Sequence, residues 1–428
     1  MKSIKVGLLG LGTVGTGVVR IVENHQEDLF GQVGSPIVIE KIVVQDRSKA
    51  RNIAVDGDRM TEDVWEVINH PDIDVIVEVM GGVETTKTYI LAALEQGKHI
   101  VTANKDLMAL HGTEILEKAK EKGCDVLYEA SVAGGIPIIR TLSEGFSSDR
   151  ITKIMGIVNG TTNYILTKMS QEGAAYEDVL KEAQALGYAE ADPTSDVEGL
   201  DAARKMTILA TLGFHANVSL DDLAVKGISQ VTKEEILYGK RLGYEVKLLG
   251  IAERQDDLIS VSVQPTMVKK SHPLASVNGV FNAVYVYGEA VGETMFYGPG
   301  AGELPTATSV VADLVAVVKN MKLGVNGQRA QAPYKEKKLK TDEQIASKYF
   351  VLLHVADKAG VLAQITQVFA EYEVSLESVL QQPNPSNPSA EIIIVTHDAS
   401  KANMNNVLKH FEGLEVIHQI KSVYRVEG

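Results

Sequence analysis

An aspartate and a lysine stand four residues apart in a strongly apolar stretch. Asp201 and Lys205 fall within the helix-like run Leu200–Leu212, so they share one face of that helix. As an exposed ion pair they would contribute only about 0.2–1 kcal/mol to stability. Residues 206–210 are apolar almost all round, however, and a charged pair at the mouth of a buried helix is costly unless it is used. A buried lysine with a lowered pKa would suit proton transfer near neutral pH.

A glycine loop near the start of the chain is the second candidate site. Residues 10–15 read G-L-G-T-V-G, which matches the fingerprint G-x-G-x-x-G between the apolar strand-like run Ile4–Leu9 and a helix-like run. Gly10 would allow the tight turn, Gly12 a close approach of the backbone to a pyrophosphate, and Gly15 close packing of helix on strand. The loop therefore predicts a dinucleotide site at a helix N-terminus, and the alternative is a glycine-rich turn without a ligand.

The charges that would select the nucleotide follow the second expected strand, Val38–Val44. Asp46 could bind a ribose 2′-hydroxyl and favour NAD, whereas Arg47, Lys49 or Arg51 could accommodate the 2′-phosphate of NADP. Any one of them could equally be a solvated loop charge. The residues leave the choice between NAD and NADP open.

A second lysine follows another expected strand end. Asn104 and Lys105 come directly after the short run Ile100–Thr102. In open parallel sheets, ligands bind beyond the carboxyl ends of the strands. Lys105 could hold a carboxylate or donate a proton near a nicotinamide, or it could be an ordinary surface lysine.

Length and composition limit what these residues can belong to. The 428 residues predict about two to four domains. With 42 Lys and Arg against 56 Asp and Glu, the net charge is −14, and no basic footprint for nucleic acid is present. The single cysteine, Cys124, excludes an intramolecular disulfide and a multi-cysteine metal cage. We expect no signal peptide and no membrane span, because no uncharged apolar run reaches about 18 residues, and hence a cytoplasmic protein.

The predicted helices and strands that must position the candidate residues follow different patterns in different parts of the chain. Residues 1–130 alternate β-branched runs with helix-like segments, which is typical of a Rossmann-type α/β domain with a parallel sheet. Residues 131–304 mix helix-like and alternating stretches and predict a mixed α+β domain. The periodic stretch 305–320 could form a helix that returns to the first domain.

The last quarter of the chain has a different pattern. Residues 326–348 are polar and lysine-rich, and they have the composition of a linker. In 349–428 the order strand, helix, strand, strand, helix, strand predicts a ferredoxin-like βαββαβ unit, with a loop at 383–388 between its middle strands.

Several of these stretches carry a resemblance to a known family. Residues 183–205 read A-x3-G-Y-A-x2-D-P-x2-D-V-x-G-x-D-x3-K, which resembles the signature of the homoserine dehydrogenases at each position. Other stretches similar to that family are the glycine loop, 101–105, 128–137, 159–164 and 298–302. The resemblance covers about residues 1–320 and implies that 131–304 form the domain for substrate binding and dimerisation. Since no aspartate-kinase segment precedes the first strand, it also implies the monofunctional form.

The resemblance implies a reaction and a set of site residues. Members of this family reduce aspartate 4-semialdehyde reversibly to homoserine with NADPH or NADH, on the route to threonine and methionine. The second lysine of the signature, Lys205, would give a proton to the substrate carbonyl, with Lys105 and Asp201 assisting. The implied substrate-binding residues are Gly187, Glu190, Asp196 and Asp201. The implied cofactor-binding residues are Gly10, Gly12, Thr13, Val14, Gly15, Arg47, Lys105 and Gly302.

One position departs from the family pattern. Several members have an arginine before the aspartate at the end of the second strand, where this chain has Gln45. If that arginine holds the 2′-phosphate, Arg47 is the residue here that could replace it.

The same resemblance implies a cation and an effector. Glu129 with the backbone carbonyls of Val132, Gly134 and Ile136 matches a monovalent-cation site, and one carboxylate plus carbonyls suits Na⁺ or K⁺. Residues 349–428 resemble an ACT regulatory domain with Gly360 in its ligand loop. This implies inhibition by threonine and association into a homodimer or homotetramer.

Two other functions compete with this interpretation. A phosphorylating semialdehyde dehydrogenase needs a cysteine nucleophile, but Cys124 stands among charged residues without a glycine-helix setting, which favours an incidental thiol. A non-catalytic amino-acid sensor would have no need of Asp201, Lys205 and Lys105.

Overall fold

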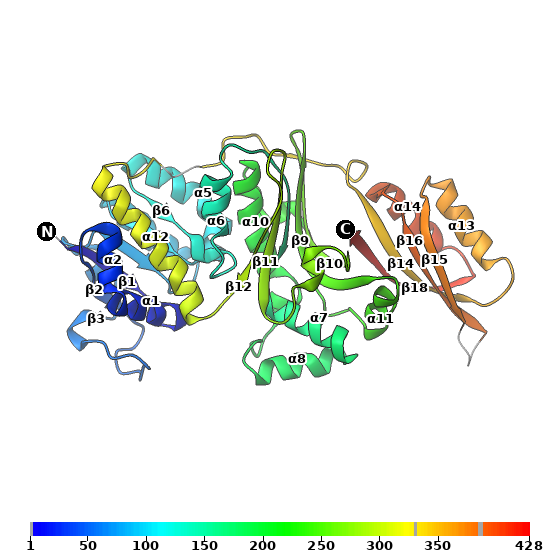
Figure 1. The fold of residues 1–428 in the computed structure, drawn as a ribbon, viewed down its shortest axis with the longest axis horizontal. Coiled ribbons are helices and arrows are strands. Elements are labelled where there is room, and N and C mark those ends of the chain that lie inside the picture. Colours follow the sequence, from blue (N-terminus) through cyan, green and yellow to red (C-terminus); the bar gives the residue numbers. More distant parts are fainter. Residues whose placement is uncertain (1–2, 329–331, 384–387) are drawn as a thin grey trace. The chain divides into compact units, whose positions relative to one another are not determined.

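The computed structural model describes residues 3–328, 332–383 and 388–428 (Figure 1). Its contacts divide the chain into two units. Unit 1 comprises Met1–Val158, Ala203–Asp222 and Asn282–Lys337, and unit 2 comprises Asn159–Ala202, Leu223–Phe281 and Lys338–Gly428. Among the helices of the described ranges, none is long and apolar enough to cross a membrane.

Unit 1 contains a six-stranded parallel sheet in the order β3-β2-β1-β4-β5-β6. The strands are β1 (Ile4–Leu9), β2 (Ile37–Val43), β3 (Met60–Thr61), β4 (Val75–Glu78), β5 (His99–Thr102) and β6 (Val126–Leu127). The strand order reverses direction between β1 and β4, which is where ligands bind in such sheets. The predicted Rossmann-type fold is confirmed. The two-residue strand β3 was not predicted, because it is too short to show an alternating pattern.

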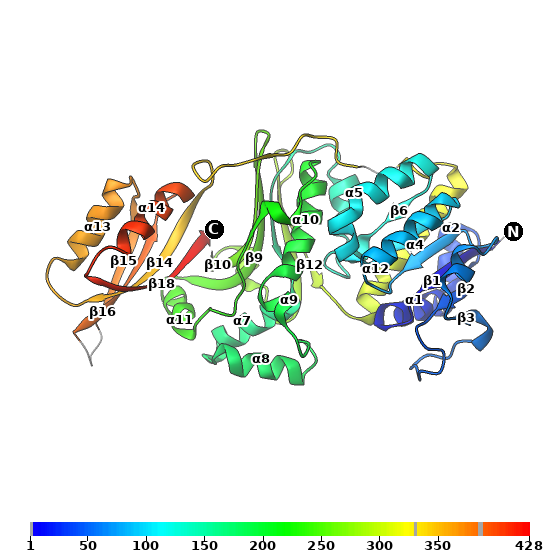
Figure 2. The same ribbon diagram turned by 180° about the vertical axis from the view of Figure 1, so that it is seen from behind.

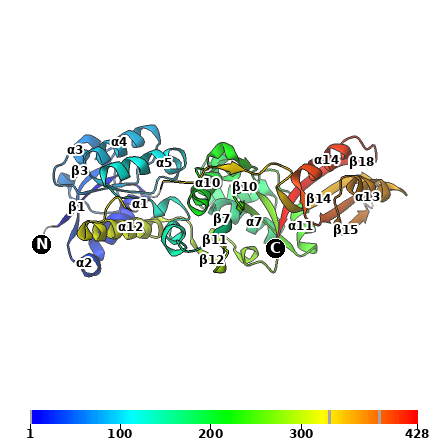
Figure 3. The ribbon, with the colours of Figure 1, turned by 90° about the horizontal axis from the view of Figure 1, so that it is seen from above.

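Helices cover both faces of this sheet (Figures 1 and 2). On one face lie α1 (Thr13–Asn24), α2 (Gln26–Val33) and α12 (Glu303–Leu323), and with the other face pack α3 (Val64–Ile68), α4 (Glu84–Glu95) and α5 (Lys105–Lys122). The periodic stretch 305–320 lies within α12. Val310 and Leu314 of α12 share one apolar core with Val18 and Val22 of α1, and the two helices lie side by side (Figure 3).

The rest of unit 1 is built from segments far apart in sequence. Strands β7 (Ile151–Ile157), β11 (Phe281–Gly288) and β12 (Gly292–Pro299) are neighbours in the order β12-β11-β7, with β11 antiparallel to β7. Helix α10 (Leu200–Phe214) contributes Ala203 onward to unit 1, and Asp201 precedes that boundary.

Unit 2 joins the remaining central segments to the C-terminal part of the chain. Its central elements are α7 (Gly160–Glu172), α8 (Tyr176–Ala185), α9 (Thr194–Val197), β8 (Leu223–Val225), α11 (Lys233–Arg241), β9 (Tyr244–Gln255) and β10 (Leu258–Lys269). Strands β9 and β10 form a long antiparallel hairpin.

The C-terminal elements follow the predicted βαββαβ order. They are β14 (Ala346–Ala356), α13 (Val361–Glu371), β15 (Leu376–Pro383), β16 (Ser389–Thr396), β17 (Ala399–Ser400), α14 (Lys401–Phe411) and β18 (Ile417–Glu427). The strands pair in the order β18-β14-β16-β15, and both helices share one apolar core with them. Strand β18 also pairs in parallel with β10, with Thr266 opposite Arg425. The ferredoxin-like unit is therefore joined to the central sheet by backbone hydrogen bonds.

The expected linker is shorter and more ordered than its composition suggested. Within 326–348, Lys338–Leu339 form β13, which pairs with β10, and β14 already begins at Ala346. Residues 329–331 of the expected linker, and 384–387 of the expected loop, lie outside the described residues. Polar composition did not reveal β13 because its two residues are exposed and pair only through the backbone.

Candidate functional site

The glycine loop forms the turn between β1 and α1. Gly10 has φ +106°, a conformation that side chains disfavour, and a Cβ on Gly15 would lie 2.1 Å from the carbonyl oxygen of Gly10. A Cβ on Gly12, in contrast, would meet nothing within 4 Å. Gly12 is the N-cap of α1 and supplies no capping side chain, so the first N–H groups of the helix stay available. This open, electropositive helix end fits a pyrophosphate.

A groove of about 850 Å³ extends from this helix end to the end of β2. Of the basic residues considered from the sequence, Lys49 and Arg51 line the groove, together with Asp46. Arg47 is not among the lining residues, and its guanidinium donates to the carbonyl of Gly57 at 2.8 Å. The guanidinium of Arg51 also donates to backbone carbonyls, those of Lys49 at 2.8 Å and Asp46 at 2.6 Å. Hydrogen bonds from the Ser48 side chain and backbone lower the pKa of Asp46.

The two lysines predicted from the sequence line one cavity of unit 1. This cavity, of about 380 Å³, contains both Lys105 and Lys205 and shares Val79 and Met80 with the dinucleotide groove. Nζ of Lys205 donates to the carbonyl of Val158 at 2.8 Å. The remaining lining residues are Val14, Glu78, Gly81, Ala103, Asn104, Asp106, Ala130, Ser131, Ala133, Gly134, Gly300, Ala301 and Thr306. A cavity with two lysines beside a dinucleotide groove can bring a substrate oxygen next to a proton donor.

Other predicted cofactor residues lie around these two spaces. Thr13 lines the groove, and Val14 lines the cavity. Gly15 lines neither space and instead allows the loop to pack closely. Gly302 is the N-cap of α12 with φ +124°, and its neighbours Ala301 and Glu303 line the cavity and the groove respectively.

Glu78 is a site residue that the sequence did not single out. It is the last residue of β4, is fully buried, and faces the cavity with Lys105 and Lys205. Burial raises the pKa of Glu78, although hydrogen bonds from Thr102, Met80 and other neighbours act in the opposite direction. A carboxylate ending an otherwise apolar parallel strand is the signal that could have identified it.

The acidic residues of the signature gather around an amide in unit 2. Nδ2 of Asn159 donates to Asp196 at 2.7 Å and to Asp201 at 2.9 Å. Asp201 is buried, whereas Glu190 is exposed and Gly187, with φ +75°, forms the exposed turn after α8. Asn159 was quoted only as part of a motif, and its role as a bridge between two carboxylates becomes visible in the structure.

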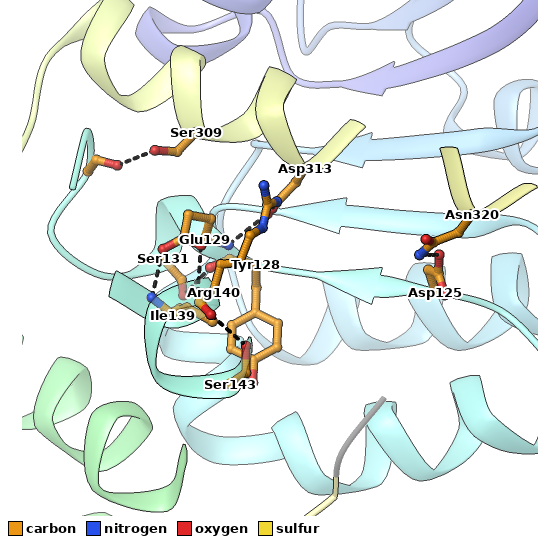
Figure 4. Close-up of polar contacts among 11 residues, drawn as sticks. Asp125, Tyr128, Glu129, Ser131, Ile139, Arg140, Ser143, Ser309, Asp313 and Asn320 are labelled. Atoms are coloured by element: carbon orange, nitrogen blue, oxygen red, sulfur yellow. Dashed lines mark hydrogen bonds and ion pairs between the residues drawn. The ribbon is translucent and has the colours of Figure 1, made fainter. Parts of the chain in front are cut away.

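Glu129, the carboxylate among the expected cation ligands, lies next to a second buried carboxyl group, that of Asp313 (Figure 4). The carboxylate of Glu129 accepts backbone N–H bonds from Ile139 at 2.7 Å and Arg140 at 2.8 Å, and its own N–H donates to Asp313 at 2.7 Å. Arg140 donates to Asp313 at 2.6 Å. Burial raises the pKa of Glu129, and burial together with Glu129 raises that of Asp313 to about 7.

A monovalent cation fits this cluster chemically. Glu129 and Asp313 are both buried, and the guanidinium of Arg140 pairs with Asp313 only, so a further positive charge could balance Glu129. Gly134, whose carbonyl accepts a hydrogen bond from Ser309 at 2.7 Å, lines the lysine cavity. Among the described residues, no group of three or more His, Cys, Asp and Glu could hold a metal ion, so such a cation would depend on backbone carbonyls.

The single cysteine has the properties of an inert thiol. Cys124 is 1% exposed, lines neither the groove nor the lysine cavity, and burial raises its pKa to about 11. A thiol with such a pKa is protonated near neutral pH and is a poor nucleophile. The burial of Cys124 and its raised pKa therefore argue against a mechanism in which this thiol forms a thioester with the substrate.

The Rossmann-type fold, the groove at the glycine loop and the cavity with Lys105 and Lys205 define a class of protein. It is an oxidoreductase that uses a nicotinamide dinucleotide. Comparisons with known families agree with this class. Residues 10–129 match the NAD-binding domain model of homoserine dehydrogenase, 137–315 the homoserine dehydrogenase model, and 349–416 the ACT domain model.

Individual relatives give the family directly. The chain is 60% identical to homoserine dehydrogenase of Bacillus subtilis, covering 100% of this chain and 99% of the relative, and 44% identical to that of Mycobacterium tuberculosis, covering 100% and 98%. A crystal structure of homoserine dehydrogenase from Thiobacillus denitrificans matches with a TM-score of 0.94 at 41% identity, covering 100% and 99%. A structure of the S. aureus enzyme matches with a TM-score of 0.80 at 40% identity, covering both chains fully. The chain belongs to the homoserine dehydrogenase family, with a C-terminal ACT domain.

Proposed function

We propose that this chain catalyses the reversible reduction of L-aspartate 4-semialdehyde to L-homoserine, in the biosynthesis of threonine and methionine. The observation that carries the proposal is the cavity that contains Lys105 and Lys205 beside the dinucleotide groove. When bound, the nicotinamide supplies a hydride for reduction or accepts one for oxidation. Homoserine-dependent formation of reduced nicotinamide, followed by absorbance, tests the activity, and no turnover with either nucleotide would contradict it.

Lys205 is the proposed proton donor. The carbonyl of Val158 holds its ammonium group in the cavity at 2.8 Å. During reduction the ammonium gives a proton to the aldehyde oxygen while the carbon accepts the hydride, and during oxidation the amine takes that proton back. Lys105, at the start of α5 in the same cavity, assists by contacting the substrate or cofactor.

The carboxylates of the signature are proposed to bind the polar groups of the substrate. Homoserine carries a cationic amino group and a hydroxyl group, for which carboxylates are suitable partners. Asp201 lies one helical turn before Lys205 on α10. Glu190, Asp196 and Gly187 complete the proposed substrate set, and Asn159 orients two of the carboxylates.

For the nucleotide, we infer that Lys49 and Arg51 are the residues that would contact the 2′-phosphate of NADP, because both line the groove, in which Asp46 could instead bind the 2′-hydroxyl of NAD. Replacing both with alanine should raise the KM for NADP about tenfold or more and change that for NAD much less, since charge-assisted hydrogen bonds contribute about 1.5–3 kcal/mol. Arg47→Ala is the control, because Arg47 donates to Gly57 and lies outside the groove lining. If Arg47→Ala changed the ratio of the two KM values and the double variant did not, Arg47 would be the phosphate residue.

A monovalent cation completes the proposed cofactor set. Glu129 and the carbonyls of Val132, Gly134 and Ile136 would hold Na⁺ or K⁺ and so balance the buried carboxyl groups. Its effect would be to fix the loop at Gly134, which lines the lysine cavity.

We also propose that threonine binds the ACT domain and inhibits the enzyme, in a cytoplasmic homodimer or homotetramer. Contacts between the ACT strand β18 and the central elements of unit 2 would allow a ligand of the ACT domain to affect those elements. The Tyr424 hydroxyl donates to Glu235 at 2.7 Å, and the Arg425 guanidinium donates to Glu253 at 2.8 Å. Deleting residues 349–428 would remove these two donors and the strand that pairs with β10, so a point variant is the better test.

Gly360→Ala should raise the threonine concentration for half-inhibition about tenfold or more. Gly360 is the exposed N-cap of α13, and a Cβ there meets nothing within 4 Å, so the methyl group would occupy ligand space. The measurement is the ratio of rates with and without threonine. Gly243→Ala is the matched control, because Gly243 also has a positive φ (+86°) and open space around its Cβ position in unit 2. Equal inhibition of both variants would contradict the site.

A further inference from the structure

A continuous set of hydrogen bonds joins the loops that follow β4 and β5, and Glu78 lies at its centre. One carboxylate oxygen of Glu78 accepts the backbone N–H groups of Met80 at 2.9 Å and Gly81 at 3.1 Å. The other accepts the hydroxyl of Thr102 at 2.6 Å. Because Glu78 is fully buried, these bonds replace the water that an exposed carboxylate would have.

The second half of the set leads to Lys105. The Thr102 hydroxyl oxygen accepts the backbone N–H of Asn104 at 3.0 Å. The side chain of Asn104 donates to the carbonyl of Gly82 at 2.7 Å and accepts the N–H of Leu107 at 3.1 Å, so it caps α5. Lys105 is the next residue and the first of that helix. Asn104 directly precedes Lys105, and its hydrogen bonds lead back through Thr102 to Glu78. The backbone at Lys105 is therefore held from its N-terminal side.

We propose that Glu78 is a positioning residue for the reaction, whose carboxylate fixes Lys105 and the Met80–Gly81 wall of the cavity in their working positions. The inference rests on the proposed role of Lys105. Both oxygens of Glu78 act as acceptors, one for two backbone N–H groups and the other for the Thr102 hydroxyl. A glutamine has one accepting oxygen and one donating amide group. If its oxygen kept the two N–H groups, its amide would donate to the Thr102 oxygen, and the buried Thr102 hydroxyl would lose the acceptor of its own proton.

A purely structural role for the carboxylate is the alternative, and Asp125 shows what that role looks like. Asp125 is also buried in unit 1 and also accepts three hydrogen bonds, from Asn320, Asn326 and the N–H of Gly327. It lines neither the groove nor the lysine cavity. Asp125→Asn is therefore the matched control for removing a buried acceptor away from the site.

The test is a double-mutant cycle on the full-length enzyme at saturating homoserine and nucleotide. Glu78→Gln and Thr102→Val should each lower kcat about tenfold or more, with a smaller change in the KM for homoserine. Because both substitutions interrupt the same path, the double variant should be little slower than the slower single variant. Asp125→Asn should lower Tm while kcat stays within about twofold of the unmodified enzyme.

The possible results distinguish a failure of this inference from a failure of the proposed function. If Glu78→Gln lowered Tm and kept kcat, as expected for Asp125→Asn, Glu78 would be structural only and the inference would be overturned. Fully additive losses in the double variant would overturn the path through Thr102. Lys105→Ala is measured in parallel. A normal kcat in Lys105→Ala would contradict the proposed role of Lys105. A lowered kcat in Lys105→Ala together with a normal kcat in Glu78→Gln would overturn only the inference about Glu78.

Discussion

Replacing Lys205 with alanine is expected to lower kcat for homoserine oxidation by about 10² to 10⁴, the range typical for loss of a positioned general acid or base. The KM for homoserine should change little, because the carboxylates around Asn159 remain in place. The reason is that, in the proposed mechanism, the Lys205 amine takes the proton from the substrate hydroxyl during oxidation and gives it back during reduction. Steady-state kinetics in both directions of the reaction provide the measurement.

Lys205→Arg separates proton transfer from charge. Arginine keeps the positive charge and can donate a hydrogen bond, but it does not release its proton at accessible pH. If Lys205 only stabilised negative charge on the substrate oxygen, the arginine variant would retain much of the activity that the alanine variant loses. Near-normal kcat in Lys205→Ala would remove this residue from the chemistry altogether.

Two glycine substitutions should also have large effects, and of different kinds. In Gly15→Ala the new methyl group would lie 2.1 Å from the carbonyl oxygen of Gly10, so the loop must move. We expect loss of both stability and nucleotide binding. In Gly12→Ala the methyl group meets no protein atom within 4 Å and enters the space that the pyrophosphate needs. Here we expect an unchanged Tm and a Kd for the nucleotide that rises about a hundredfold.

Thermal unfolding with and without nucleotide, together with nucleotide titration, distinguishes the two variants. At a fixed nucleotide concentration, tighter binding raises Tm more, so Gly12→Ala should lose most of that increase while keeping the Tm of the free protein. A Gly12→Ala variant that binds nucleotide normally would show that the pyrophosphate lies elsewhere. An equal loss of Tm in both variants would contradict the open space at Gly12.

Much of the fold and part of the site follow from local sequence patterns. The alternation of strands and helices in residues 1–130 and the βαββαβ order at the C-terminus depend on periodicities that neighbouring residues define. The glycine loop is recognisable because its geometry depends on residues 10–15 and the strand before them. Asp201 and Lys205 both lie on α10, where helical spacing places them on one face.

The remaining site residues depend on which strand ends meet. The hydrogen bond between Glu78 and Thr102 joins residues 24 apart, and that between Asn159 and Asp201 joins residues 42 apart. Likewise, only the folded loop after β2 shows that Lys49 and Arg51 line the groove while Arg47 bonds to Gly57. A local pattern describes a residue and its near neighbours along the chain. Partners distant in sequence are decided by the packing of parallel strands, and so only the tertiary structure reveals them.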